Sequence, residues 1–210
     1  MKPKNNVIKI VSSLKNTLLK ISQFNSWSAR NYAPPSPQFV KEKVLFRHGL
    51  CNAIWIETGT YLGTTTKFLA KEAEFVYSIE PEINLYNRAQ HLFSEYPNVK
   101  IINGTSEGVM STLLQGVGTR VNFWLDGHYS AGITFQGDLD TPVMIELASI
   151  ELHLQDFMEI AIFIDDVRCF NPLIPEYSTY PELNLLTNWA LKNRFSWTIE
   201  NDILIMKKDS

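Results

Sequence analysis

Residues 54–63 read Ile54-Trp55-Ile56-Glu57-Thr58-Gly59-Thr60-Tyr61-Leu62-Gly63, and Thr64-Thr65-Thr66 follow directly. The apolar run that ends at Glu57 predicts a strand, and the segment between the two glycines predicts a tight turn into a helix. Glycine adopts backbone angles closed to other residues and lets a ligand approach the main chain. One of the threonines is expected to cap the helix, whose free N–H groups would then face a nucleotide-type ligand.

A second predicted strand also ends in an acid, and its separation from this turn in the sequence matches a known nucleotide-binding pattern. Residues 75–80 form another apolar run, and Glu80 stands 23 positions after Glu57. In Rossmann-like sites, an acid about 20 residues beyond the glycine turn binds the two ribose hydroxyls. A carboxylate accepts both hydrogen bonds, and its charge strengthens them. Glu80 is therefore predicted to bind a ribose; the alternative is a solvated residue at a strand end.

The chain from Asn52 onward alternates between strand and helix patterns. Strands are expected near residues 53–57, 75–80, 99–103, 121–126 and 160–165, and helices near residues 64–73, 82–95, 106–115 and 142–157. Residues 196–206 indicate two short strands that turn at Asn201 and Asp202. This alternation predicts an α/β fold with a parallel sheet and helices on both faces. Ligands of such sheets bind at the carboxyl ends of the strands, where polar residues of this sequence gather.

Three acids follow two strands that are expected to be neighbours. Asp126 ends one strand pattern, and Asp165 and Asp166 follow the other. Clustered carboxylates repel one another unless a cation or a proton neutralises them, and oxygen ligands at this density favour Mg²⁺, Mn²⁺ or Ca²⁺. We therefore predict a divalent-metal site formed by these three acids. The alternative is that Asp166 caps a turn, Asp165 pairs with Arg168 and no metal binds.

Four segments together resemble a known family. They are Glu57-Thr-Gly-Thr-Tyr-Leu-Gly-Thr-Thr65, Ser78-Ile-Glu-Pro81, Ile101-Ile-Asn-Gly-Thr-Ser-Glu107 and Phe123-Trp-Leu-Asp-Gly-His-Tyr129. Over residues 44–210 the chain resembles the class I S-adenosylmethionine-dependent methyltransferases. Its D-G-H and I-D-D segments resemble the metal-dependent O-methyltransferases of the macrocin type, which act on sugars. The resemblance implies a Rossmann-like methyltransferase fold: a mostly parallel seven-stranded sheet with an antiparallel C-terminal strand and helices on both faces.

The resemblance also implies which residues bind the cofactor. S-adenosylmethionine would contact Glu57, Thr58, Gly59, Thr60, Tyr61, Gly63, Thr64, Glu80, Thr105, Ser106 and Asp126. Tyr61 departs from the family, which usually has a glycine there. Thr105 or Ser106 has an alternative role as the cap of the helix that follows.

The same resemblance assigns chemical roles to the acids and to one histidine. Mg²⁺ or Mn²⁺, held by Asp126, Asp165 and Asp166, would lower the pKa of the hydroxyl that attacks. His128 lies two residues after Asp126. A neutral imidazole there is predicted to take the proton of the acceptor hydroxyl, with Asp126 as the second catalytic residue. The alternative is a structural histidine.

These features together predict an O-methyltransferase that acts on a hydroxyl of a sugar, a glycan or a glycosylated metabolite. Two alternatives remain open: a methyltransferase of the same fold that needs no metal, and a non-catalytic module that only binds the cofactor. The acceptor is expected to be a small molecule or a glycan. Nucleic acid is not expected, because the catalytic region is acidic and lacks a basic stripe.

Charge divides the chain into two parts. Residues 1–53 hold nine Lys and Arg and one acid, whereas the rest holds ten Lys and Arg and 21 acids. We assign residues 1–50 to a basic helical segment with a proline-rich linker and residues 51–210 to the catalytic domain. Cys51 and Cys169 show neither a C-x-x-C spacing nor a disulfide framework. With no secretory signal or apolar run of membrane length, the sequence indicates a cytoplasmic protein, and we expect a homo-oligomer.

The N-terminal segment is predicted to be a basic amphipathic helix. Its apolar residues fall on one broad helical face, interrupted by lysines: Val7, Ile8, Ile10, Val11, Leu14, Leu18, Leu19 and Ile21. Such a helix can lie on an anionic membrane surface or pack on a partner. The alternative is that it docks on its own acidic domain or on a second subunit. A second helix, residues 38–48, is expected to cover the mouth of the active site.

Overall fold

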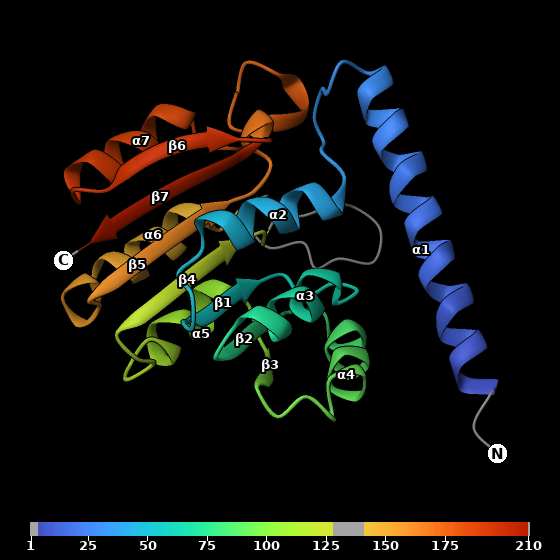
Figure 1. Cartoon of the computed structure of the whole chain (residues 1–210). Helices are drawn as coiled ribbons and strands as arrows, with labels where there is room; N and C mark the ends of the chain where they lie inside the picture. Colours follow the sequence, from blue (N-terminus) through green and yellow to red (C-terminus); the bar gives the residue numbers. More distant parts are fainter. Residues whose placement is uncertain (1–3, 128–140, 210) are drawn as a thin grey trace.

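The computed structural model describes residues 4–127 and 141–209, with side chains in the ranges 14–127 and 141–208 (Figure 1). Seven strands of this part of the chain form one sheet in the order β3-β2-β1-β4-β5-β7-β6. Their bounds are β1 Ile54–Thr58, β2 Phe75–Glu80, β3 Val99–Asn103, β4 Arg120–Leu125, β5 Glu159–Ile164, β6 Ser196–Glu200 and β7 Ile203–Asp209. β1 to β5 pair in parallel, and β7 is antiparallel to both β5 and β6. The predicted fold class is confirmed.

Helices cover both faces of the sheet. Their bounds are α1 Lys4–Ala29, α2 Gln38–His48, α3 Thr64–Glu72, α4 Ile83–Leu92, α5 Ser106–Leu113, α6 Val143–Glu151 and α7 Leu183–Lys192. Consecutive strand residues point to opposite faces, as the pleat requires. Ile56, Phe123, Ile162 and Leu204 pack in the layer that holds α5, α6 and α7. Trp55, Trp124, Phe163 and Ile205 pack in the layer that holds α2 and α3. Because both faces are covered at the centre of the sheet, the central strands β1, β4 and β5 are buried almost throughout.

One predicted helix is shorter in the structure, and one helix was not predicted. The helix expected over residues 142–157 ends at Glu151, and a short 3₁₀ turn, Leu154–Asp156, follows it. Helix α7 was not predicted, although Leu186, Trp189 and Ala190 form a buried stripe on it at helical spacing. The predicted turn at Asn201 and Asp202 is present; both residues have positive φ, which Asn and Asp tolerate better than most.

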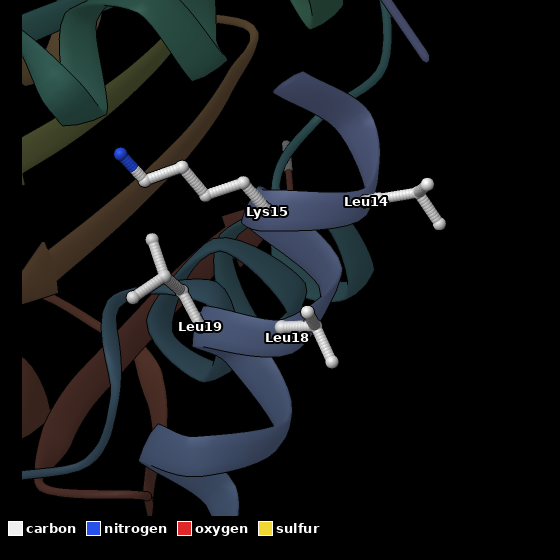
Figure 2. Close-up of a pocket in the computed structure, with 4 residues that line it drawn as sticks. All are labelled: Leu14, Lys15, Leu18 and Leu19. Carbon is white, nitrogen blue, oxygen red and sulfur yellow. The ribbon is translucent and has the colours of Figure 1, made fainter. Parts of the chain in front are cut away.

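The first helix, α1, projects along one side of the molecule (Figure 1). Leu14, Leu18 and Leu19 are each more than half exposed, and Figure 2 shows Leu14 and Leu18 pointing away from the chain. These side chains therefore do not dock on their own domain, which was one of the alternatives. Within the residues that the structure describes, no helix is long and apolar enough to span a membrane.

Candidate functional site

The turn after β1 is fixed between the two neighbouring strands. The N–H groups of Gly59 and Thr60 donate to the carbonyl oxygen of Ile79, at 3.0 and 3.2 Å. Gly59 has a φ of +90°, and a Cβ at this residue would lie 2.9 Å from the carbonyl oxygen of Asp126. Tyr61, which stands where the family usually has glycine, adopts the left-handed conformation with a φ of +48°. The turn thus passes closely over the end of β4 and leaves its outer side open.

The side chains of this turn divide between the surface and the interior. Tyr61 and Thr64, at the outer side of the turn and the start of α3, are exposed. Thr58 and Thr60 are buried, and the hydroxyl of Thr60 lies 2.6 Å from that of Ser78. Of the predicted cofactor residues in this segment, Tyr61 and Thr64 therefore have side chains at the surface, whereas Thr58 and Thr60 support the turn from the interior.

The predicted threonine cap of α3 is wrong. The N-cap residue is Gly63, which has a φ of +77° and makes no side-chain capping bond. Thr65 instead accepts a hydrogen bond from the amide of Gln38 at 3.0 Å, and Thr66 donates to Glu57 at 2.6 Å. The left-handed backbone at Gly63 suits glycine. The side chains of Thr65 and Thr66 therefore form hydrogen bonds to α2 and β1 and do not cap α3.

Glu57 lies beneath the turn rather than at its surface. Its side chain is fully buried, and one carboxyl oxygen accepts hydrogen bonds from Thr66 and Ser78, both at 2.6 Å. The other oxygen has no hydrogen-bond partner in the described part of the chain. Burial raises the pKa of Glu57 to about 8, although the two hydroxyl donors oppose the rise. Glu57 is thus a largely neutral acid at pH 7 that joins β1, β2 and α3.

Glu80 joins the two turns that follow β1 and β2. Its carboxylate accepts the N–H of Tyr61 at 2.7 Å and the N–H of Glu82 at 3.0 Å. Burial raises its pKa above the ordinary value, and these two backbone donors oppose that rise. The side chain of Asn103 at the end of β3 donates to the carbonyl oxygen of Glu80 at 2.9 Å. The predicted ribose residue therefore lies directly beside the glycine turn, as the sequence pattern requires.

The turn after β3 carries the residues predicted to contact the adenine. Thr105 is the N-cap residue of α5 but makes no side-chain capping bond. Ser106 is buried at the first turn of α5, and its hydroxyl donates to Glu107 at 3.3 Å. The alternative of a hydroxyl cap is therefore not seen at Thr105.

The three predicted metal ligands meet at the carboxyl edge. β4 and β5 are parallel neighbours with Leu125 opposite Ile164, so Asp126 and Asp165 follow paired positions. Both Asp165 and Asp166 are buried. Burial, together with the charge of Asp126, raises the pKa of Asp165 to about 7. The prediction that these acids follow two neighbouring strands is thus confirmed.

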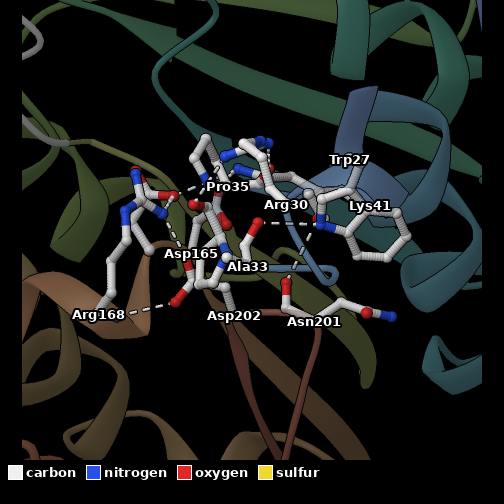
Figure 3. Close-up of polar contacts among 12 residues, drawn as sticks. Trp27, Arg30, Ala33, Pro35, Lys41, Asp165, Arg168, Asn201 and Asp202 are labelled. Carbon is white, nitrogen blue, oxygen red and sulfur yellow. Dashed lines mark hydrogen bonds and ion pairs between the residues drawn. The ribbon is translucent and has the colours of Figure 1, made fainter. Parts of the chain in front are cut away.

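Two cations from the chain already compensate the acids (Figure 3). The ammonium of Lys41, on α2, pairs with Asp165 and lies 3.4 Å from Asp166. Arg168 pairs with Asp166 at 2.7 Å and also with Asp202. In the alternative without a metal, Asp165 was to pair with Arg168; in the structure Asp165 pairs with Lys41, and Arg168 pairs with Asp166. Lys41 was missed, although its helix was expected to cover the mouth of the site.

The three acids Asp126, Asp165 and Asp166, as the structure arranges them, do not fit a permanently bound divalent ion. Across residues 4–127 and 141–209, no group of three or more His, Cys, Asp or Glu side chains is arranged to hold a metal. The ammonium of Lys41 lies between two of the three acids that would have to converge on the ion. His128, with the other loop residues up to 140, lies outside the described residues, so its predicted role as a base stays a prediction.

A second buried acid, Glu146 on α6, was also missed. It is fully buried, and neither of its carboxyl oxygens has a hydrogen-bond partner in the described residues. Burial raises its pKa to about 7. It lines a small cavity of about 10 Å³ together with Asp126 and Asp165. The signal in the sequence was a single acid within the apolar run of residues 143–150.

The comparisons with known proteins support the same fold. No protein-family model matches the sequence. A segment of 64 residues is 42% identical to a protein of Methanococcus vannielii assigned as ribosomal RNA small subunit methyltransferase A. The match covers 30% of this chain and only 24%, about a quarter, of that relative.

Solved structures align over most of the chain. A Staphylococcus aureus protein assigned as a caffeoyl-CoA O-methyltransferase is 12% identical over 98% of this chain and 99% of that chain, with a TM-score of 0.54. A Streptococcus mutans protein solved with S-adenosylhomocysteine (SAH) is 16% identical over 83% of this chain and 98% of that chain, with a TM-score of 0.50. The chain therefore has the Rossmann-like methyltransferase fold.

One expectation is overturned by these comparisons. Nucleic acid was not expected as a partner, because the catalytic region is acidic and lacks a basic stripe. The Methanococcus vannielii relative is assigned to ribosomal RNA. The 23S rRNA methyltransferase ErmE is also similar, with 16% identity over 81% of this chain and 67% of that chain and a TM-score of 0.50. Net charge is too coarse to decide the acceptor, so the exclusion is withdrawn.

Proposed function

We propose that the protein is an S-adenosylmethionine-dependent methyltransferase. The observation that carries the proposal is the contact between the Glu80 carboxylate and the N–H of Tyr61, at 2.7 Å, on the glycine turn. This contact places a carboxylate beside an open main-chain turn, in a sheet whose strand order is β3-β2-β1-β4-β5-β7-β6. A ribose diol and the methionine part of the cofactor need those two features side by side.

The remaining predicted residues fit roles around this contact. Gly59 lets the methionine part approach the main chain, because any Cβ there would meet Asp126. The N–H groups of the first turn of α5, which begins at Ser106, would lie at the edge of the adenine. The exposed Tyr61 and Thr64 border the cofactor. The acceptor would enter beside Asp126, where β4 ends next to β5.

The chemistry is an in-line displacement. The acceptor atom forms a bond to the methyl carbon while the bond from that carbon to the sulfonium sulfur breaks, and SAH leaves. Holding the two partners in line lets orientation supply much of the rate. A hydroxyl acceptor also loses a proton, which His128 is proposed to take. Asp126, two residues before His128, is proposed as the second catalytic residue. The donor set does not fit Mg²⁺ or Mn²⁺, so no step is assigned to a metal.

For the acceptor, a hydroxyl of a sugar or a glycosylated metabolite is proposed, on the resemblance of the D-G-H and I-D-D segments to O-methyltransferases that act on sugars. Ribosomal RNA is the second candidate, favoured by the name of the Methanococcus vannielii relative. That support comes from a match over 30% of this chain, so it concerns a part of the domain only.

Two measurements test the proposal. Calorimetry should show that SAH binds and that NAD does not; binding of NAD in preference to SAH would contradict a methyltransferase site. Labelled S-adenosylmethionine, incubated with the protein and a host-cell extract, should then transfer its methyl group to the small-molecule or glycan fraction. Label in purified ribosomal RNA instead would select the second candidate.

A further inference from the structure

The buried acids at the ends of β4 and β5 need a positive charge. Asp165 and Asp166 are adjacent, buried and close to Asp126. Like charges in a weakly polar interior repel strongly, and a buried carboxylate without a partner destabilises the folded state. The sequence pattern predicts a divalent ion as the source of that charge. Here the side chain of Lys41 reaches the same place.

Lys41 is held in that position by the packing of its helix. Val44 and Leu45, one turn further along α2, are fully buried against the sheet and α3. Gln38, one turn before, binds Thr65 at 3.0 Å. The side chain of Lys41 is only 13% exposed, so the ammonium is part of the interior and not a surface charge. Burial alone would lower its pKa, but the charges of Asp165, Asp166 and Asp126 together raise it above its ordinary value.

Arg168 completes the compensation from the other side. Its guanidinium pairs with Asp166 at 2.7 Å and with Asp202, whose other oxygen accepts the N–H of Arg168 at 2.8 Å. Asp166 is thus shared between Lys41 and Arg168. A divalent ion bound by Asp126, Asp165 and Asp166 would lie within a few ångströms of the ammonium of Lys41, and that repulsion opposes its binding.

We propose that Lys41 is a built-in cation that takes the place of the divalent metal, so that the site formed by Asp126, Asp165 and Asp166 binds no Mg²⁺ or Mn²⁺. Lys41 acts through the two carboxylates it pairs with and is therefore a positioning residue. If the protein is a methyltransferase, as proposed above, the acceptor hydroxyl would react without being bound to a metal; this consequence rests on the proposed function.

The test is direct binding of Mn²⁺, measured by electron paramagnetic resonance on the full chain after removal of metals. Wild type should show no site that depends on Asp165. Lys41→Met removes the ammonium but keeps the apolar stem, and it should gain a Mn²⁺ site whose affinity is at least about tenfold above any residual Mn²⁺ binding by wild type. The double variant K41M/D165N should lose that gain. Lys43→Met, on the exposed side of α2, is the matched control and should behave as wild type.

Two results would overturn the inference. One is a tight Mn²⁺ site in wild type that Asp165→Asn abolishes, and this measurement stands even if Lys41→Met fails to fold. The other is a folded Lys41→Met that gains no Mn²⁺ affinity, because the acids would then not form a cation site at all. SAH binding, measured by calorimetry on the same samples, reports on the proposed function separately, so the two can fail independently.

Discussion

The backbone N–H of Tyr61 donates to the carboxylate of Glu80 at 2.7 Å, which ties the turn after β1 to the end of β2. The second carboxylate oxygen accepts the N–H of Glu82 at 3.0 Å, so Glu80 organises two turns at once. A side chain in this position shapes the open turn even before a ligand arrives. Binding and local structure are therefore expected to respond together when Glu80 is changed.

Glu80→Gln should weaken SAH binding by about 1.5–3 kcal/mol, because charge-assisted bonds to the ribose are lost. The amide also turns an N–H₂ group toward one of the two backbone donors. Calorimetry gives the affinity, and circular dichroism checks that the fold is kept. Glu95→Gln, on the exposed surface, is the control. Equal affinity in wild type and Glu80→Gln would remove Glu80 from the cofactor site.

Gly59→Ala should destabilise the protein more than Gly116→Ala does. Both glycines have positive φ, +90° and +77°, but a Cβ on Gly116 meets nothing within 4 Å, whereas one on Gly59 lies 2.9 Å from the Asp126 carbonyl oxygen. Gly116→Ala should cost about 1–2 kcal/mol from backbone strain alone, and Gly59→Ala about 1–3 kcal/mol more from the close contact. Urea unfolding measures both, and losses of the same size would show that the turn relaxes freely.

The fold and the position of Glu80 beside the glycine turn could be predicted from the sequence because local patterns encode them. Apolar runs ending in Glu57 and Glu80, with glycines between, depend on neighbours in the chain, and the structure places Glu80 beside the turn. The hydrogen bonds of the threonines after Gly63 were not accessible in this way. They depend on which backbone angle the turn adopts and on partners such as Gln38.

Lys41 and Glu146 could not be predicted because their roles depend on packing between distant segments. Lys41 meets Asp165 across 124 positions of sequence, and only the seating of α2 on the sheet brings them together. Glu146 stands in an apolar helix whose sequence alone does not reveal that both oxygens are buried without a partner. Asp126 and Asp165 were correctly expected to be neighbours, yet the sequence did not show which cation compensates them.

Stability should fall as the pH rises from about 4.5 to about 8, in part through Glu57. Its pKa is raised to about 8 in the folded protein, above the ordinary value of 4.5. Its contribution is therefore fully present below pH 4.5 and is lost as the pH rises through 8, because only the unfolded chain releases the proton readily in this interval.

Glu57→Gln cannot titrate and should remove this part of the pH dependence. The amide oxygen can still accept the hydrogen bonds of Thr66 and Ser78. Between pH 5 and pH 8.5, the free energy of unfolding of the variant should improve relative to wild type by on the order of 1–4 kcal/mol. Urea titrations at both pH values measure this, with Glu95→Gln as a control that follows wild type. Parallel pH profiles for wild type and Glu57→Gln would show that Glu57 is ionised in the fold.

The identity of the proton acceptor can be decided by comparing His128→Ala with Glu146→Gln, once an acceptor has been identified by label transfer. Burial raises the pKa of Glu146 to about 7, so it titrates in the same range as an ordinary histidine. A wild-type rate that rises with pH near neutrality therefore fits His128, Glu146 or Asp165, whose pKa is also raised to about 7, and the pH profile of wild type alone cannot separate them. We expect His128→Ala to lower kcat by roughly 10²–10⁴ and to remove that rise, with SAH affinity unchanged.

Glu146→Gln keeps the shape of the side chain but cannot accept a proton, and it should leave the pH profile of the rate as in wild type. His91→Ala, on the exposed side of α4, is the matched histidine control. If Glu146→Gln removes the rise and His128→Ala does not, the base is Glu146 and the role assigned to His128 is wrong.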